Sequence, residues 1–181
     1  MDDNGTKGRA GATESLAADA QVVRHTPGDC PISAPRLQPP SILESSLYCP
    51  DLDAAERFYR NVFGLEVVAR QSGRHVFLRC GQGMVLLFNP DATADPTLPT
   101  GGPPMVPHGA HGPGHLAFRM LERDIERWRA QLTTAGVPIE AEVLWPQGGH
   151  SLYLRDPAGN SLELATAALW GLTDSPVSGG A

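Results

Sequence analysis

The sequence lacks the features that several classes of function require. No apolar run in its 181 residues approaches the roughly 20 residues that a membrane-spanning helix needs. Lys and Arg number 14 against 20 Asp and Glu, which leaves a formal net charge of -6. Because nucleic-acid binding needs a surplus of Lys and Arg on one face, this deficit argues against a nucleic-acid partner. The polar start MDDNGTKGRAG also lacks the apolar core of a signal peptide. We therefore expect neither a membrane nor nucleic acid among the partners.

Cysteine and aromatic residues are also scarce. The three cysteines, Cys30, Cys49 and Cys80, are odd in number, widely spaced and without a CxxC pair. This pattern argues against a disulfide framework and favours a reducing, cytoplasmic location. With only 3 Trp, 3 Tyr and 5 Phe in the chain, a groove built mainly from stacked aromatic rings is disfavoured.

The folded part is expected to be a single domain over residues 41–167. Residues 1–40 contain no Phe, Tyr or Trp and are rich in Ala, Gly, Asp and Pro, so we expect a weakly ordered tail. A second loose tail is expected over residues 168–181. Between the two tails, the patterning predicts module one at 41–89, a Pro/Gly loop at 90–113 and module two at 114–167.

The two modules repeat one order of elements, a strand, a helix and three strands. Apolar spacing predicts helices at 51–64 and 122–136, the first with Asp51 or Asp53 as N-cap and Gly64 at its end. Alternation of apolar and polar residues predicts strands at 41–49, 65–71, 74–80 and 83–89, and again at 114–120, 137–145, 150–156 and 160–166. Such self-similarity indicates an internal duplication and an α+β fold.

The loop between the modules is dense in Pro and Gly. Its composition excludes a helix or an inner strand and is typical of a linker or a functional lid. His108 and His111 precede His115 with a spacing that resembles a zinc motif, but the intervening Gly, Ala and Pro exclude convergence on a helix. We expect a flexible lid that can bring one of these two histidines near a site.

Three polar residues stand on strand faces that otherwise carry small side chains. They are Glu44, His115 and Glu163, and in each strand the opposite face is aliphatic. Laying one module over the other places Glu44 on His115 and Leu87 on Glu163. Two interpretations follow from the alternation: a metal site made of the three residues, or three half-exposed polar residues on the outer face of a sheet.

Three segments resemble a known family. DLDAAERFYRNVFGLEV, GPGHLAF and YLRDPAGNSLEL are similar to the helix signature, the second-module first strand and the closing hairpin of the vicinal oxygen chelate superfamily, the glyoxalase/bleomycin resistance/extradiol dioxygenase group. The resemblance covers residues 41–166. It implies two tandem βαβββ modules that form a curled mixed sheet around a cavity, and a possible homodimer, in some members with a cavity completed between the chains.

The resemblance also implies a ligand set for a divalent metal. The metal positions of the family fall on Glu44, where many members have His or Gln, and on His115 and Glu163. A fourth position falls on or beside Leu87, which cannot bind metal; this is a departure from the glyoxalase-type pattern. Two carboxylates and one imidazole suit Fe, Mn, Ni, Zn or Mg as the divalent ion.

The chemistry expected at such a site is proton transfer on a small oxygen-rich substrate. The metal would chelate two adjacent substrate oxygens, and Glu163 or Glu44 would move a proton, as in lyases and isomerases. Further catalytic candidates are Tyr153 and His75; candidates for substrate binding are Arg79, His150 and Leu87. An Fe(II)-dependent dioxygenase is one alternative, although Glu44 replaces a usual His, and a metal-free resistance protein that binds a drug or natural product is another.

Overall fold

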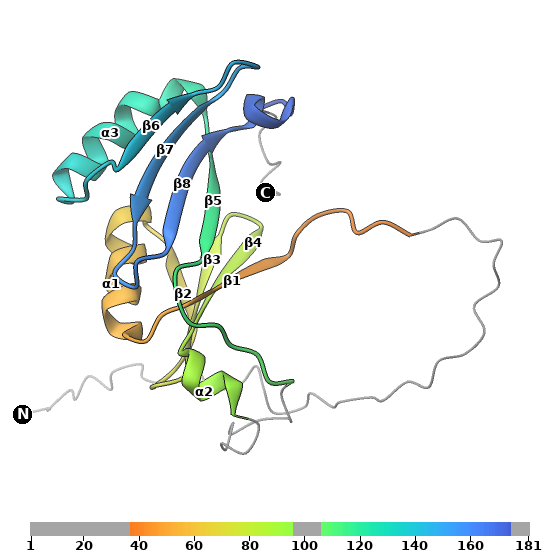
Figure 1. The fold of residues 1–181 in the computed structure, drawn as a ribbon, viewed down its shortest axis with the longest axis vertical. Helices are drawn as coiled ribbons and strands as arrows, with labels where there is room; N and C mark the ends of the chain where they lie inside the picture. Colours follow the sequence, from red (N-terminus) through yellow and green to blue (C-terminus); the bar gives the residue numbers. More distant parts are fainter. Residues whose placement is uncertain (1–36, 96–105, 175–181) are drawn as a thin grey trace, which may run out of the picture.

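The computed structural model describes residues 37–95 and 106–174 (Figure 1). Of the two tails expected to be weakly ordered, residues 1–36 and 175–181 lie outside the described residues, whereas 37–40 and 168–174 are described. Within the described part, no helix is long and apolar enough to cross a membrane.

Each module forms its own four-stranded mixed sheet. Module one contains β1 (Glu44–Tyr48), α1 (Leu52–Phe63), β2 (Glu66–Gln71), β3 (His75–Cys80) and β4 (Gly83–Phe88), with strand order β1-β4-β3-β2. Module two contains β5 (His115–Met120), a 3-10 turn η1 (Glu122–Asp124), α3 (Ile125–Thr134), β6 (Ala141–Leu144), β7 (His150–Arg155) and β8 (Ser161–Thr166), with order β5-β8-β7-β6. In each module the first strand pairs in parallel with the last strand, and the other neighbouring strands pair antiparallel. The predicted α+β class and duplicated order are confirmed, as two open sheets that do not close into a barrel.

Local signals determine where α1 begins and ends. The Asp51 carboxylate accepts a hydrogen bond from the Ala54 backbone N–H at 2.9 Å, which satisfies one of the free donors of the first turn. Gly64 ends the helix in the left-handed conformation, with φ of 68°. Of the two predicted N-caps, Asp51 is the one used.

A short helix interrupts the loop for which a helix was excluded. α2 spans Pro90–Ala94, so the prediction is wrong for these residues. Pro90 occupies the first turn, where its missing N–H would have no intrahelical partner anyway. The Asn89 side chain accepts from the N–H groups of Asp91 and Ala92 and so caps the helix.

The two modules share one hydrophobic core. α1 and α3 lie on the same side of the molecule (Figure 1), and the Gln131 side chain of α3 donates to the Val62 carbonyl of α1 at 2.7 Å. Phe63 and Phe118 pack with ring centroids 4.8 Å apart. The shared core holds the outer, helix-covered faces of the two sheets and leaves their other faces for function.

A buried polar cluster also joins the modules. Asp156, in the turn after β7, accepts a hydrogen bond from the hydroxyl of Tyr59 on α1 at 2.9 Å. The Asn160 side chain donates to the same carboxylate at 2.8 Å. Tyr59 is 0% exposed and Asp156 5% exposed. The turn between β7 and β8, with the sequence DPAGN, is therefore also a tether between the modules.

After β8 comes a 3-10 turn, η2 (Ala167–Trp170), at the start of the segment that was expected to be a loose tail. It packs closely against the turn between β6 and β7. The space is so small that a Cβ added to Gly149 would lie 2.6 Å from the Leu169 backbone nitrogen.

Candidate functional site

His115 and Glu163 meet on the open face of the second sheet. β5 and β8 run parallel, and their register sets Glu163 opposite Ala117, two residues after His115 on the same face. His115 Nε2 lies 3.3 Å from Glu163 Oε2. The Glu163 side chain is only 7% exposed, whereas that of His115 is 52% exposed. The pair therefore consists of a buried carboxylate and a half-exposed imidazole.

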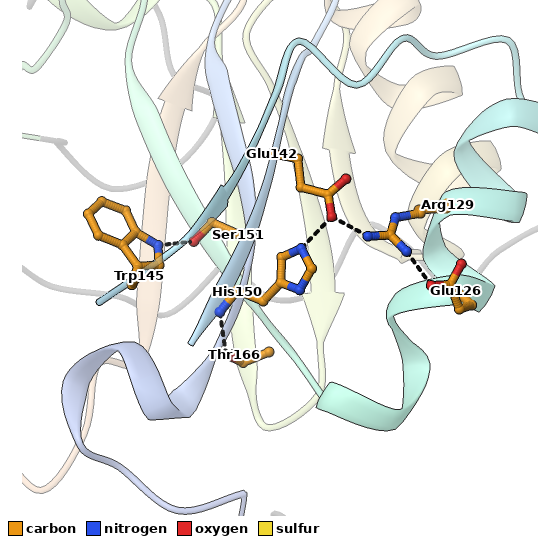
Figure 2. A network of polar contacts seen from close by, with 7 residues as sticks. All are labelled: Glu126, Arg129, Glu142, Trp145, His150, Ser151 and Thr166. Atoms are coloured by element: carbon orange, nitrogen blue, oxygen red, sulfur yellow. Dashed lines mark hydrogen bonds and ion pairs between the residues drawn. The ribbon is translucent and has the colours of Figure 1, made fainter. Parts of the chain in front are cut away.

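Glu163 is held from the other side by Ser151. The Ser151 hydroxyl donates to Glu163 Oε1 at 2.5 Å, and this contact is buried. Ser151 in turn accepts a hydrogen bond from the indole N–H of Trp145 at 2.9 Å (Figure 2). One carboxylate oxygen is thus occupied by Ser151, and the other faces His115.

Tyr153 lies directly beside the pair. It stands opposite Glu163 in the β7–β8 register. The rings of Tyr153 and His115 are stacked, with their centroids 6.4 Å apart. Burial raises the pKa of Tyr153, and hydrogen bonding to Glu163 and the charge of that residue raise it further. Tyr153 therefore keeps its proton and can donate a hydrogen bond.

The spacing of the two donor atoms fits a single divalent ion. Ligand atoms bound about 2.1 Å from a common ion, at angles between 90° and the tetrahedral value, lie about 3.0 to 3.4 Å apart. The observed 3.3 Å between Nε2 and Oε2 is within that range. Among the described residues, however, no group of three or more His, Cys, Asp or Glu side chains gathers closely enough to hold a metal.

Glu44 is the predicted ligand that does not join this pair within the chain. It is exposed on β1, in register with Met84 of the first sheet. It lines a hollow of about 250 Å³ where the edges of β1 and β5 meet, together with Ala117 and Arg119. The predicted metal role of Glu44 stays a prediction.

The prediction for Leu87 is wrong, because this residue faces the core. Leu87 is 0% exposed and belongs to the hydrophobic cluster under the helices. The register instead sets Leu86 opposite Ser46, just as Glu163 stands opposite Ala117 in the other module. Leu86 is therefore the counterpart of Glu163. The one-residue error inverts the face, since side chains alternate along a strand.

His75 and Arg79 share a face of β3, as predicted. Their partners on β4 are Phe88 and Met84. His75 stacks on Phe77 with centroids 4.1 Å apart. Burial, and then the charge of Arg74, lowers the pKa of His75. Both residues belong to the first sheet rather than to the sheet of His115, and their roles stay predictions.

His150 points away from the candidate pair. It precedes Ser151 on β7, so its side chain leaves the opposite face of the strand and contacts Glu142, which also binds Arg129 (Figure 2). Its backbone N–H donates to the Thr166 hydroxyl at 2.9 Å. This orientation does not support the predicted contact of His150 with a substrate bound at Glu163.

The described part of the loop is docked on module one. His108 Nδ1 lies 3.0 Å from the Tyr48 hydroxyl, and His111 pairs with Asp91 of α2 at 3.2 Å. Neither contact involves the pair formed by His115 and Glu163. The central part of the predicted lid, residues 96–105, lies outside the described residues.

Trp145 and Ser151 are the contributors that sequence reasoning missed. Neither residue is among the predicted site residues. The signal that was available is that Ser151 shares its face with Tyr153 in a strand next to Glu163.

Comparison with known proteins places these residues in context. The model of a family described as the Glyoxalase/Bleomycin resistance protein/Dioxygenase superfamily matches residues 41–164. The crystal structure of a lactoylglutathione lyase from Agrobacterium tumefaciens is 42% identical, has a TM-score of 0.70, and aligns over 74% of this chain and 98% of its own.

Two other solved structures share the fold at lower identity. TioX from Micromonospora sp. ML1 is 24% identical with a TM-score of 0.54, over 70% of this chain and 98% of its own. The fosfomycin resistance protein FosX from Listeria monocytogenes is 18% identical with a TM-score of 0.51, over 73% and 95%. No curated protein matches the chain significantly.

Proposed function

Because the chain belongs to the Glyoxalase/Bleomycin resistance protein/Dioxygenase superfamily, we propose that it is a metal-dependent enzyme of the lyase or isomerase type. The observation that carries this proposal is the convergence of His115 Nε2 and Glu163 Oε2, 3.3 Å apart on an open sheet face. A protein that only bound a drug on an apolar surface would have no need of this pair. The 42% identity to a structure named as a lactoylglutathione lyase supports the same class.

His115 and Glu163 are the residues that would hold the metal. A divalent ion held there would supply Lewis-acid polarisation of substrate oxygens and stabilise negative charge on them. Imidazole and carboxylate suit Zn, Ni, Mn or Fe.

The chain's own residues supply the proton chemistry. The Glu163 carboxylate would accept a proton from the carbon beside a substrate carbonyl and return it to the neighbouring carbonyl carbon of the same substrate. Tyr153 keeps its phenolic proton, because burial and Glu163 raise its pKa, and with this proton it donates a hydrogen bond to the Glu163 carboxylate. Ser151 holds Glu163 by one oxygen, so that the carboxylate does not turn away during the transfer.

We further propose that the active form is a homodimer in which Glu44 of one chain serves the His115–Glu163 pair of the other. Glu44 is exposed and lies outside that pair within its own chain. Several large apolar side chains are more than half exposed in the isolated chain, as a surface for self-association requires: Ile42, Leu43, Leu144, Trp170 and Leu172.

Elemental analysis and turnover of the purified protein test the enzyme proposal. We expect one divalent ion per chain, and loss of that ion in His115→Ala and Glu163→Gln but not in Glu140→Gln, a matched control on the exposed ion pair with Arg155. Lactoylglutathione is the first substrate to offer: proton transfer converts it to a hemithioacetal, which breaks its C–S bond to give free thiol and a 2-oxoaldehyde, and formation of both products in equal amounts is the measurement. A wild-type protein that holds no metal under saturating conditions would refute the proposal.

Two further measurements separate the alternatives. Oxygen uptake after anaerobic Fe²⁺ loading would indicate a dioxygenase instead. For the dimer, mixing Glu44→Gln with His115→Ala chains restores one intact site in each mixed dimer if the site is shared. No recovery of activity would show that each site belongs to one chain.

A further inference from the structure

We infer that Trp145 and Ser151 are positioning residues that hold the Glu163 carboxylate in the orientation facing His115. The inference rests on the proposed function for the assignment of Glu163 to the metal. The hydrogen-bonded chain itself stands on distances in the protein: 2.9 Å from Trp145 Nε1 to Ser151 Oγ, and 2.5 Å from Ser151 Oγ to Glu163 Oε1.

The chemistry of the three groups gives this chain a single direction. An indole N–H can only donate, and a serine hydroxyl has one proton to give. Because Trp145 donates to the oxygen of Ser151, the Ser151 proton is directed to Glu163. An ionised carboxylate only accepts. The remaining oxygen of Glu163 is then the one next to His115, at 3.3 Å.

The backbone holds Trp145 in place for this role. Its N–H donates to the Gly149 carbonyl at 3.1 Å, and its carbonyl accepts from the Gly148 N–H at 2.9 Å. Gly149 has a φ of 106°, and a Cβ there would lie 2.6 Å from the Leu169 nitrogen, so only glycine fits the turn. This turn sets Trp145 directly after β6, two residues beyond Val143, the register partner of Ser151 on β7, so that the indole N–H reaches Ser151 (Figure 2).

Burial makes the Ser151 hydroxyl hard to replace by solvent. Ser151 is 0% exposed and Glu163 is 5% exposed. Without the hydroxyl, the carboxylate would lose a charge-assisted hydrogen bond and would be free to rotate or to bind an ion through both oxygens. Loss of such an outer partner of a ligand costs about 10- to 100-fold in metal affinity.

Titration with Co²⁺, followed by calorimetry and by the visible spectrum of the bound ion, measures the effect on metal binding. We expect Ser151→Ala to weaken Co²⁺ binding by about 10- to 100-fold and to change the spectrum. Trp145→Phe, which keeps an aromatic ring but removes the N–H, should also weaken Co²⁺ binding, by a smaller factor than Ser151→Ala. The double variant binds no more weakly than Ser151→Ala alone, because Trp145 acts through Ser151. Melting temperatures of the metal-free variants show whether all remain folded.

A second measurement needs no metal. In the ¹⁵N-labelled, metal-free protein, the Trp145 indole resonance is expected to shift in Glu163→Gln and to stay unchanged in Glu140→Gln, the same substitution on a carboxylate bound to Arg155. A Trp145 resonance that does not respond to Glu163→Gln overturns the inference.

The two readouts distinguish failure of the inference from failure of the proposed function. If the wild type binds Co²⁺ and both Ser151→Ala and Trp145→Phe bind it equally well, the positioning role is wrong and the metal site stands. If the wild type binds no Co²⁺, the proposed function fails. The indole resonance then decides by itself whether Trp145 and Ser151 orient Glu163.

Discussion

Replacing Tyr59 by Phe removes one hydroxyl from the buried tether between the modules, and its cost can be worked from the contacts. The hydroxyl donates to Asp156 Oδ2 at 2.9 Å and is part of a side chain that is 0% exposed. A hydrogen bond to a charged acceptor contributes about 1.5 to 3 kcal/mol. Asp156 keeps its other donors, among them the Asn160 side chain at 2.8 Å. We therefore expect Tyr59→Phe to lower the free energy of unfolding by about 2 kcal/mol.

Asp156→Ala is the larger perturbation of the same cluster. It leaves the hydroxyl of Tyr59 and the backbone N–H of Asn160 without their acceptor, whereas the Asn160 side chain keeps the Tyr48 carbonyl. Because each buried, unsatisfied donor costs about 1 to 3 kcal/mol, the loss should exceed about 3 kcal/mol. Tyr48→Phe is the matched control, since its hydroxyl contacts His108 in a half-buried place and should contribute about 1 kcal/mol or less.

Urea unfolding followed by circular dichroism measures these differences, with equal m-values as the condition for comparing them. A Tyr59→Phe protein within about 0.5 kcal/mol of the wild type would refute the reasoning. It would mean that desolvation of the hydroxyl offsets the hydrogen bond that it makes.

The same cluster predicts a loss of stability at alkaline pH. Burial, and then the charge of Asp156, raises the pKa of Cys49 from 9.0 to about 12, and the same two causes raise the pKa of Tyr59. Above pH 9 the unfolded chain therefore loses protons that the folded chain retains, so stability falls as pH rises. For Cys49 the fall amounts to about 4 kcal/mol between pH 9 and pH 12. Cys49→Ala should make the alkaline limb of the stability curve shallower, and an unchanged limb would contradict this account.

Three further substitutions test the assignments of individual residues. Leu87→Ala should cost about 2 to 5 kcal/mol in urea unfolding, because Leu87 lies in the core, and leave metal affinity unchanged; weaker metal binding at equal stability would restore Leu87 to the site. His75→Phe should reduce the loss of stability as pH falls below 6.5. Burial and Arg74 lower the pKa of His75 in the folded chain, so the unfolded chain binds the proton at higher pH. The same fall of stability at acid pH in variant and wild type would show that His75 does not cause it. Glu142→Gln should weaken the dependence of stability on salt and leave turnover unchanged, because Glu142 pairs with Arg129 on the face away from Glu163; a large fall in kcat would place His150 in the reaction after all.

Local patterns in the sequence predicted most of the elements. The stripe of Ala55, Phe58, Tyr59 and Val62 predicted α1; all but Phe58 are buried, and Phe58 packs partly buried against the core. Alternation predicted all eight strands, although β6 (Ala141–Leu144) is shorter than the predicted 137–145. These predictions succeed because periodicity and capping are properties of neighbouring residues. Composition misled at α2, since a proline that breaks a helix interior is well suited to a first turn.

The candidate site could be predicted only in part. Alternation put His115 and Glu163 on open faces, and the parallel pairing of β5 with β8 brings them to 3.3 Å. Leu87 was placed one residue from the true counterpart of Glu163, because the register between strands depends on loop lengths that the alternation does not contain.

The sequence by itself therefore determined the order of the elements, the ends of the first helix, the duplication and the face on which each candidate ligand lies. All of these follow from periodicity, capping and turn chemistry over short stretches of chain. Only the tertiary structure decided which polar groups meet: Ser151 and Trp145 behind Glu163, Tyr59 on Asp156, and Glu44 outside the pair. Such contacts depend on strand register and on the packing of one module against the other. Both are determined jointly by residues that are distant in the sequence.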